Sequence, residues 1–326
     1  MSLSDLAYIL KGNGKNAKLP YYARAYARML VPAAICRARL PRLLVEIDRR
    51  PDAEEIYARA DYYCRLDPGV PVALPADAPT IADLAHGHHG VYNLDTMEYA
   101  RYFSPQLHLC LRGGDNILVP EVPSLVKSRP IREDASNARA VVLKLNKVRH
   151  FIFVDDRIPF EAKDPRALFR GKARLKPLRL RFMERWHGHP RVCAATIDAP
   201  VAAWQDRKFT IAEQLRFRYI MAIEGNDVAS NLKWVMSSDS LAVTPPMNYE
   251  TWFMEGTLEA GRHYIEVRPD FSDLEEKMDY YDSHPAEARE IIREAHAYVD
   301  RFRDGRRERL ISLLVLHRYF AATGQI

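Results

Sequence analysis

The sequence predicts an α/β fold built on a parallel, Rossmann-like sheet. Strand-like and helix-like apolar patterns alternate along most of the 326 residues, and the turns between them are short. Parallel strands need a crossover connection between them, so this alternation favours a parallel sheet over an all-α or all-β fold. With 48% hydrophobic residues, the chain can bury one large core or two medium ones.

The first half is expected to begin with helices and to continue with strands. Apolar residues between positions 21 and 49 recur three and four positions apart, as in a helix, and Pro32 and Pro41 are expected to interrupt it. Residues 67–79 are rich in Pro and Ala and predict a surface connection. The further elements expected are strands at 106–111, 140–145 and 150–154 and a basic, helix-prone stretch at 163–186.

The second half alternates more regularly. The elements expected there are strands at 192–197, 219–223, 240–244 and 263–267, and helices at 228–237, 249–256, 285–302 and 306–320. Residues 272–275, Ser-Asp-Leu-Glu, have the form of a capping box, which predicts that a helix begins at that point.

Composition bears on the compartment of the protein. The four cysteines are scattered, without the spacing of a metal site or a disulfide framework, which favours a reducing cytoplasm: Cys36, Cys64, Cys110 and Cys193. The chain does not open with a basic flank and a long apolar run, so no signal peptide is expected. No apolar run approaches about 18 residues, so no membrane-spanning helix is expected either.

Positive charge is concentrated near the start of the chain. Residues 11–50 hold ten Lys or Arg against Glu46 and Asp48, within a mild net charge of +5. One interpretation is a solvated basic helix face. The other is attraction to anionic membrane headgroups or to an anionic glycan. No aromatic-interleaved basic patch follows, so nucleic acid is not an expected partner.

Several motifs of nucleotide and hydrolase chemistry are absent from the sequence. It contains no GxGxxG, no GxxxxGK[ST] and no GxSxG, which disfavours dinucleotide oxidoreductases, P-loop enzymes and serine hydrolases. It also lacks the Asp-x-Asp pair that commonly holds a metal ion against a donor diphosphate. A metal-free diphosphate site would instead use Arg, Lys and helix N-termini.

Two histidine-rich segments raise the question of a zinc site. They are His86-Gly-His88-His89 and His187-Gly-His189. Neither has HExxH spacing or a cysteine pair nearby, so polar loops are the favoured interpretation and no metal site is predicted.

Residues 224–234 are the most informative segment. A strand is expected to end at Ile223, a Gly-Asn-Asp turn follows, and a helix is expected to open close by. Ligands of open α/β folds bind outside the carboxyl ends of strands, and a helix N-terminus offers free N–H groups to an anion. Lys233 would add a full positive charge beside them. The segment therefore predicts an anion site.

Three groups of residues together resemble glycosyltransferase family 90, the capsule-associated and protein O-glucosyl transferases. The C-terminal group comprises residues 219–234, Ser240-Leu-Ala-Val, Glu250-Thr-Trp252, Leu258 and His263-Tyr264. The second is Phe169-Arg-Gly171 with the basic cluster after it, and the third is Leu111-Arg-Gly-Gly-Asp115 with Pro123 and Val126-Lys-Ser-Arg-Pro130. The resemblance covers about residues 92–302. The Lys-Ser-Arg-Pro-Ile and Glu-Gly-Asn-Asp versions resemble the bacterial branch associated with lipopolysaccharide core assembly.

The resemblance implies two Rossmann-like domains of the glycosyltransferase B type, with the active cleft between them. The N-terminal acceptor-side domain would cover residues 1–162, the nucleotide-sugar-binding domain 163–304, and a C-terminal helix at 305–326 would pack back on the N-terminal domain. The implied reaction is an inverting, metal-independent transfer from a UDP-sugar, without a cofactor. Asp115 would be the general base; without the resemblance, it would be taken for an ordinary turn residue.

The resemblance also suggests how the donor is bound. The expected donor-binding residues are Arg170, Gly171, Lys172, Arg179, Gly225, Asn226, Asp227, Asn231, Lys233 and Glu255. Two of them depart from the family pattern, because Lys172 replaces a Ser and Asn231 falls at or near an expected Arg. Glu255 is expected to hold the ribose hydroxyls, with Glu250 as the alternative. Trp252 and Tyr264 are expected in the core rather than in the site.

The expected acceptor is a lipopolysaccharide-type glycan, reached by a cytoplasmic enzyme at the inner face of a membrane. Two alternatives remain at the level of sequence. One is a catalytically inactive protein that binds a nucleotide or a glycan on the same scaffold, against which an intact Asp115 argues. The other is a peripheral membrane scaffold, based on the basic segment alone.

Overall fold

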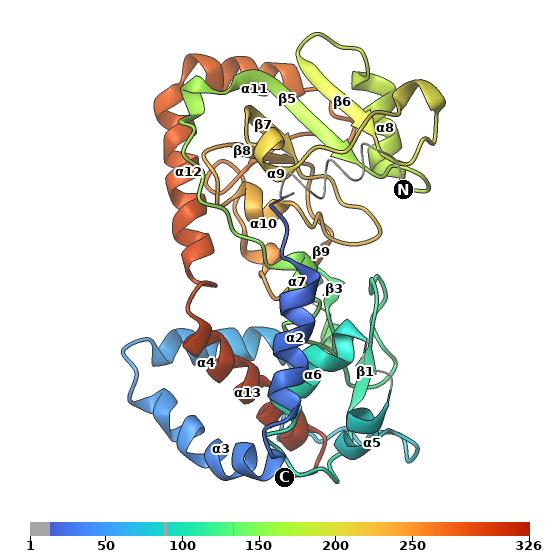
Figure 1. Ribbon diagram of the computed structural model, residues 1–326, viewed down its shortest axis with the longest axis vertical. Coiled ribbons are helices and arrows are strands. Elements are labelled where there is room, and N and C mark those ends of the chain that lie inside the picture. The colour runs from blue at the N-terminus through green and yellow to red at the C-terminus, as the bar shows by residue number, and fades with distance from the viewer. Residues whose placement is uncertain (1–13, 88–89, 133) are drawn as a thin grey trace. The chain divides into compact units, whose positions relative to one another are not determined.

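The computed structural model describes residues 14–87, 90–132 and 134–326 (Figure 1). The chain forms two compact units, each assembled from segments far apart in the sequence. Unit 1 contains the described part of Met1–Asn16, Arg149–Asn248 and Glu255–Arg301. Unit 2 contains Ala17–Val148, Tyr249–Met254 and Phe302–Ile326. Both units contain parallel sheets and helices, so the predicted mixed α/β class is confirmed.

Unit 1 is built on a five-stranded sheet in the order β10-β8-β7-β5-β6, and every neighbouring pair of strands is parallel. Its strands are β5 (Asp164–Gly171), β6 (Val192–Thr196), β7 (Phe217–Met221), β8 (Leu241–Thr244) and β10 (Ile265–Glu266). β5 and β8 carry runs of three or more buried residues, the pattern of strands covered on both faces.

Helices cover this sheet and supply much of the core of unit 1. They are α8 (Pro177–Trp186), α9 (Ile211–Gln214), α10 (Leu232–Val235), α11 (Leu274–Ser283) and α12 (Pro285–Asp300). Phe182 of α8, Tyr219 of β7 and Phe271 before α11 belong to one buried apolar cluster. Because α8 follows β5 directly, residues in its first turn lie near the carboxyl end of that strand.

Unit 2 combines helices with two small sheets. Its helices are α2 (Lys18–Met29), α3 (Ala33–Asp48), α4 (Ala53–Tyr63), α5 (Ile81–His86), α6 (Val91–Ala100) and α13 (Gly305–Ala322), and α7 (Lys147–His150) lies where the chain passes to unit 1. One sheet is parallel and pairs β1 (Cys110–Arg112), β2 (Ser124–Val126) and β4 (Ala140–Val142). The other pairs β3 (Ser128–Pro130) with β9 (Tyr249–Thr251) in antiparallel orientation.

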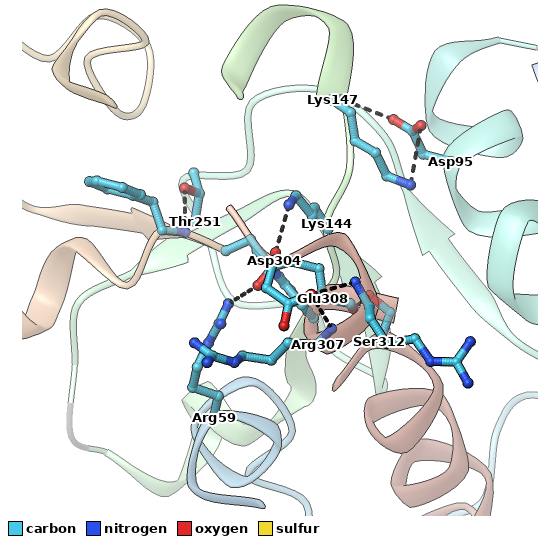
Figure 2. Close-up of polar contacts among 12 residues, drawn as sticks. Arg59, Asp95, Lys144, Lys147, Thr251, Asp304, Arg307, Glu308 and Ser312 are labelled. Carbon is cyan, nitrogen blue, oxygen red and sulfur yellow. Dashed lines mark hydrogen bonds and ion pairs between the residues drawn. The ribbon is translucent and has the colours of Figure 1, made fainter. Parts of the chain in front are cut away.

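A buried charge cluster joins α13 to the rest of unit 2 (Figure 2). The Glu308 carboxylate lies 2.7 Å from Arg59 Nη2 and 2.6 Å from Lys144 Nζ, and it also accepts a hydrogen bond from Trp252 Nε1 at 2.7 Å. Trp252 is fully buried and stacks on Tyr63 at 3.9 Å between ring centroids. Trp252 therefore lies in the core, as expected from the sequence. Tyr264, in unit 1, is buried as well.

The structure confirms several predicted elements and corrects others. Pro32 separates α2 from α3 as expected, but Pro41 lies within α3 and does not end it. Residues 150–154 form no strand, and the stretch from 163 begins with β5 before α8. Residues 249–256 contain β9 and a 3₁₀ turn instead of a helix. A helix does begin near residue 272, but Asp273 is its N-cap and no side-chain capping bond forms.

The boundary between unit 2 and unit 1 lies after Val148, whereas the expected domain boundary lies after residue 162. Tyr249–Met254 also belongs with unit 2 although it lies within the expected second domain. The terminal helix α13 packs against α3, α4 and α6. Within the described residues, no helix has the length and the apolar character needed to cross a bilayer.

Candidate active site

The order of strands in the unit 1 sheet reverses at β5. The chain leaves β5 for β6 on one side and then returns to add β7 on the other side. In an open parallel sheet, ligands bind in the crevice outside the carboxyl ends of the two strands where the order reverses. β5 ends at Gly171 and β7 ends at Met221, so the residues that follow these positions are the first candidates.

Arg179 in the first turn of α8 links the ends of these two strands. Its Nε and Nη2 donate to the carbonyl oxygen of Ile223 at 3.1 and 2.7 Å, and its Nη1 donates to the carbonyl oxygen of Lys172 at 2.9 Å. A guanidinium group has five N–H donors, so three are used here and two remain for another acceptor. Arg179 is thus fixed at the switch point of the sheet.

Glycine allows the close approach of Arg179 to the backbone. A Cβ atom built on Gly225 would lie 3.1 Å from Arg179 Nη2, and one built on Gly171 would lie 3.6 Å from Nη1. The contact at Gly225 is tight enough that a larger residue would displace the guanidinium. Both glycines were selected from the sequence, and the structure places both of them next to the same cation.

The charge of Arg179 is matched by carbonyl groups rather than by a bonded carboxylate. It makes no ion pair with any residue in the described ranges. Burial, together with nearby Arg149, lowers the pKa of Arg179 to about 10 in spite of Asp198 and Asp227. A partly desolvated cation in this position would be stabilised by an anionic ligand.

Arg170 and Lys172 have different surroundings although they are close in sequence. Arg170 pairs with Asp206 at 3.0 Å, and its guanidinium carbon lies 4.2 Å from the centre of the Phe209 ring. Burial lowers the pKa of Arg170, and its Nε has no hydrogen-bond partner. Lys172 is exposed, and its carbonyl group accepts from Arg179. Arg170 therefore has a carboxylate partner, whereas Arg179 has none among the residues that the structure describes.

The turn after β7 is closed by its own backbone and bonded to the loop between β8 and β9. Gly225 N donates to the carbonyl oxygen of Asp227 at 2.9 Å. The Glu224 carboxylate accepts from the backbone N and from Nδ2 of Asn248, both at 2.9 Å. Asp227 is buried, while Asn226 is exposed. The turn is thus fixed by hydrogen bonds to the loop that follows β8.

The helix expected to open beside this turn is much shorter than predicted. α10 covers only Leu232–Val235, so the prediction of a helix N-terminus at Val228 is wrong. Asn231 is the N-cap of α10 without a side-chain capping bond, and its Nδ2 donates to the carbonyl oxygen of Met221 at 3.0 Å. Asn231 therefore supports the end of β7 through the backbone.

Lys233 and Glu255 form a buried pair with each other. Lys233 Nζ lies 2.6 Å from Glu255 Oε1, and the two side chains are 0% and 1% exposed. The pair joins α10 to the 3₁₀ turn Glu255–Thr257. Glu250, the alternative ribose ligand, belongs to unit 2 and pairs with Arg129 Nε at 2.7 Å. The roles assigned to these residues in donor binding stay predictions.

Asp115 lies in unit 2, three residues after the end of β1. The Gly113-Gly114 turn precedes it, and Gly114 has a φ of 94°, which glycine adopts without strain. Asp115 Oδ1 accepts from Lys127 Nζ at 2.6 Å. The Lys127 side chain is 1% exposed and the Asp115 side chain 25% exposed. The lysine of this pair is thus buried, whereas the carboxylate reaches the surface of the unit.

Several residues around these positions had no role in the sequence interpretation. Asp198, after β6, accepts from the backbone N atoms of Ala173 and Arg174 at 3.0 and 3.1 Å and so holds the exit of β5. Lys127 belongs to the motif Val126-Lys-Ser-Arg-Pro130, but nothing in the sequence predicted that it pairs with Asp115. The available signal for Asp198 was its position as a polar residue directly after a predicted strand.

The structure shows no metal cluster among the residues it describes. No group of three or more His, Cys, Asp or Glu side chains that could hold an ion occurs in those ranges. His187 Nδ1 lies 3.2 Å from the carbonyl oxygen of Ala194, and the His189 ring packs on Trp186. Part of the His86–His89 segment lies outside the described residues.

Comparison with known proteins identifies the family of the chain. The family model described as glycosyl transferase family 90 matches residues 137–305. The chain is also 38% identical over 310 residues to an O-glucosyltransferase, LpsA, of Dichelobacter nodosus, covering 93% of this chain and 95% of that protein. The chain belongs to glycosyltransferase family 90. It is therefore a glycosyltransferase, and the resemblance inferred from the sequence is confirmed.

The family match covers the switch point of this glycosyltransferase but not its candidate base. Arg179, Gly225 and Lys233 lie inside residues 137–305, and Asp115 lies before them. The enzyme thus has its matched region mainly in unit 1, while the Asp115–Lys127 pair is in unit 2.

Proposed function

We propose that this family 90 enzyme is an inverting glycosyltransferase that moves a sugar from a UDP-sugar to a lipopolysaccharide-core or related glycan acceptor. The proposal assigns donor binding to unit 1 and acceptor activation to unit 2, the division of labour in B-type glycosyltransferases. The reaction would take place in the cytoplasm, as expected from scattered cysteines, which are free among the described residues.

The observation that carries the proposal is the position of Arg179 at the switch point. Its guanidinium is held by two backbone carbonyl groups, has no carboxylate partner among the described residues, and lies next to two glycines. A diphosphate carries negative charge and several acceptor oxygens, which suit the remaining donors of a fixed guanidinium. Exposed Lys172 could add a second charge from the end of β5.

In the proposed reaction, the acceptor hydroxyl oxygen attacks the anomeric carbon of the donor sugar. The bond from that carbon to the diphosphate oxygen breaks, UDP departs with the bonding electrons, and the hydroxyl proton passes to the Asp115 carboxylate. Lys127 at 2.6 Å holds this carboxylate in place, and the carboxylate is partly exposed to solvent, where an acceptor hydroxyl group could reach it. Arg179 would stabilise the charge that develops on the departing diphosphate.

The sugar and the acceptor are suggested by the relatives. The similar protein of Dichelobacter nodosus is named an O-glucosyltransferase, which supports glucose as the transferred sugar and UDP-glucose as the donor. The Lys-Ser-Arg-Pro-Ile and Glu-Gly-Asn-Asp segments resemble the branch associated with lipopolysaccharide cores, which supports the acceptor class.

Thermal unfolding with a panel of nucleotide sugars tests the donor. A ligand that binds only the folded protein stabilises it by about 2.7 kcal/mol at a concentration of 100 times its Kd. UDP-glucose and UDP should raise the Tm, whereas GDP- and CMP-sugars should not. UDP release in the presence of lipopolysaccharide-core acceptors then tests the transfer. Stabilisation by a different nucleotide alone would contradict the proposed donor.

A further inference from the structure

Helix α2 carries an apolar stripe that no other described element covers. Leu19 is 81% exposed, and Leu30, at the C-cap of the helix, is 85% exposed. Leu19, Ala23 and Leu30 are four and seven positions apart, so they lie on one face of the helix. Ala25, the buried residue of α2, faces away from this stripe. Exposed leucines aligned on one helix face are unusual when no partner covers them.

The apolar surface continues through the turn into α3. Val31 is 43% exposed and Ile35 44% exposed, with exposed Pro32 between them. Leu30, Val31 and Ile35 thus lie close together in the chain, where α2 ends and α3 begins.

The exposed face of α3 mixes arginines with apolar residues. Ile35, Arg39, Arg42, Val45 and Arg49 are three or four positions apart and all exposed. The buried residues Cys36, Leu43 and Ile47 occupy the opposite face, which is the side that packs against α13 and α4. This face is therefore directed outward, with a basic character along the length of the helix.

The acidic residues of α3 do not neutralise these arginines. Glu46 is bonded to Arg306, and Asp48 accepts from the hydroxyl group of Tyr57 at 2.6 Å. Arg39 and Arg49 make no ion pair with any residue in the described ranges. The exposed charge along this face is thus positive.

We propose that the elbow surface docks the enzyme on an anionic lipid bilayer. The elbow surface is the exposed faces of α2 and α3 together with the turn at 30–32. Leu30, Val31 and Ile35 would enter the boundary between headgroups and acyl chains, and the arginines of α3 would contact the phosphates. Charge complementarity favours an anionic bilayer over a second copy of the chain, because two copies would bring like charges together. The inference is independent of the donor site.

Vesicle co-flotation tests the charge contribution. Each arginine near an anionic surface contributes on the order of 1 kcal/mol, or about fivefold in affinity. Arg39→Glu, Arg42→Glu and Arg49→Glu in one variant should therefore weaken binding to phosphatidylglycerol-containing vesicles by about a hundredfold or more. The matched control is Arg185→Glu, Arg216→Glu and Arg309→Glu, three exposed arginines elsewhere with the same change in net charge. The control variant should bind like the unmodified enzyme.

A second variant tests the apolar contact. Leu30→Ser with Ile35→Ser should weaken vesicle binding about tenfold or more, since each buried Leu or Ile side chain contributes about 1.5–3 kcal/mol when fully removed from water. Val70→Ser with Leu175→Ser removes two apolar residues outside the elbow surface that are 67% and 88% exposed, and it should have no effect. The same Tm for all variants would show that each is folded.

The result that overturns the proposal is equal vesicle binding by the elbow and control variants, or no binding by the unmodified enzyme at low salt. Sedimentation without lipid tests the alternative occupant, a second copy of the chain. If the unmodified enzyme is a dimer that does not bind vesicles, and Leu30→Ser with Ile35→Ser makes it monomeric, the elbow surface is a dimer interface instead. The vesicle experiments use neither donor nor acceptor, so failure of the proposed glycosyl transfer would leave them unaffected.

Discussion

Two lysine–carboxylate pairs in the enzyme have the same distance but different surroundings. Lys127 Nζ lies 2.6 Å from Asp115 in unit 2, and Lys233 Nζ lies 2.6 Å from Glu255 in unit 1. Both lysines are buried, but the Asp115 side chain is 25% exposed and the Glu255 side chain 1% exposed. Only the first pair has a carboxylate that a substrate could approach without prior rearrangement of the unit.

The difference separates a chemical role from a structural one. A carboxylate held in place by a buried cation and open to solvent is accessible to a substrate hydroxyl group, which a general base requires. A fully buried pair satisfies its own charges, and removal of one partner leaves the other buried and uncompensated. We therefore expect substitutions at the first pair to change turnover and substitutions at the second to change stability.

The largest expected effect follows from Asp115→Asn. The amide has nearly the same shape but cannot take the proton of the acceptor hydroxyl group, so turnover should fall by about 10²–10⁴. Donor binding and the Tm should remain close to those of the unmodified enzyme. Steady-state UDP release and thermal unfolding measure the two quantities.

The control for Asp115→Asn is Asp61→Asn, another carboxylate of unit 2 that pairs with a cation, Arg318, at 2.6 Å. It should keep full turnover. An Asp115→Asn enzyme with most of its activity would remove this residue from the mechanism.

Lys233→Met tests the buried pair. Breaking a buried ion pair costs about 3–5 kcal/mol because the remaining charge is uncompensated. The free energy of unfolding, measured with urea, should fall by that amount. The double variant Lys233→Met with Glu255→Leu should recover much of the loss, since no charge then remains buried.

The comparison for Lys233→Met is Arg293→Met, which breaks the ion pairs of an exposed arginine with Glu290 and Glu294 and should leave the free energy of unfolding nearly unchanged. If Lys233→Met kept its stability but lost donor affinity, the lysine would act on the diphosphate as the sequence suggested, and the distinction between the two pairs would fail.

These two pairs also show where sequence reasoning succeeds and where it stops. The strands β6, β7 and β8 were predicted because continuous apolar runs bounded by turns are typical of buried parallel strands, whereas β5 lies in a stretch that was expected to be helical. Gly225 followed from its place in the turn after a predicted strand, and Gly171 followed from the family resemblance of Phe169-Arg-Gly171. The length of a helix was harder to predict from the sequence. α10 is short because tertiary contacts, and not helix propensity, determine the conformation of residues 228–237.

The pairing of charges could not be read from the sequence at all. Lys233 and Glu255 are 22 positions apart, and nothing local indicates that the lysine points to the carboxylate rather than to a ligand. Arg179 and Lys233 were equal candidates for the diphosphate in the sequence. Only the structure shows that one is held by carbonyl groups and the other by an acid.

Arg179→Gln extends the comparison to a cation that is held by backbone carbonyl groups instead of by a carboxylate. The variant loses the charge but keeps a side chain able to donate to a carbonyl group. A hydrogen bond to a charged group contributes about 1.5–3 kcal/mol, so UDP affinity should fall by about 10- to 100-fold. Calorimetric titration with UDP measures this. Arg181→Gln on the exposed side of α8 should leave UDP affinity unchanged, and an Arg179→Gln enzyme that binds UDP normally would contradict the proposed donor site.

The smallest expected effect is that of a chelator, which should leave activity unchanged. The sequence has no Asp-x-Asp, and carboxylates at the carboxyl edge are already engaged: Asp198 accepts from two backbone N atoms, and Glu224 accepts twice from Asn248. A divalent ion on a diphosphate needs carboxylate oxygens directed at it, whereas Arg179 can offset the same charge without them. Activity should therefore persist after dialysis against EDTA. Activity that disappears and returns with manganese or magnesium would mean that an acid such as Glu255 leaves its lysine to hold the ion, and the buried pair would no longer be purely structural.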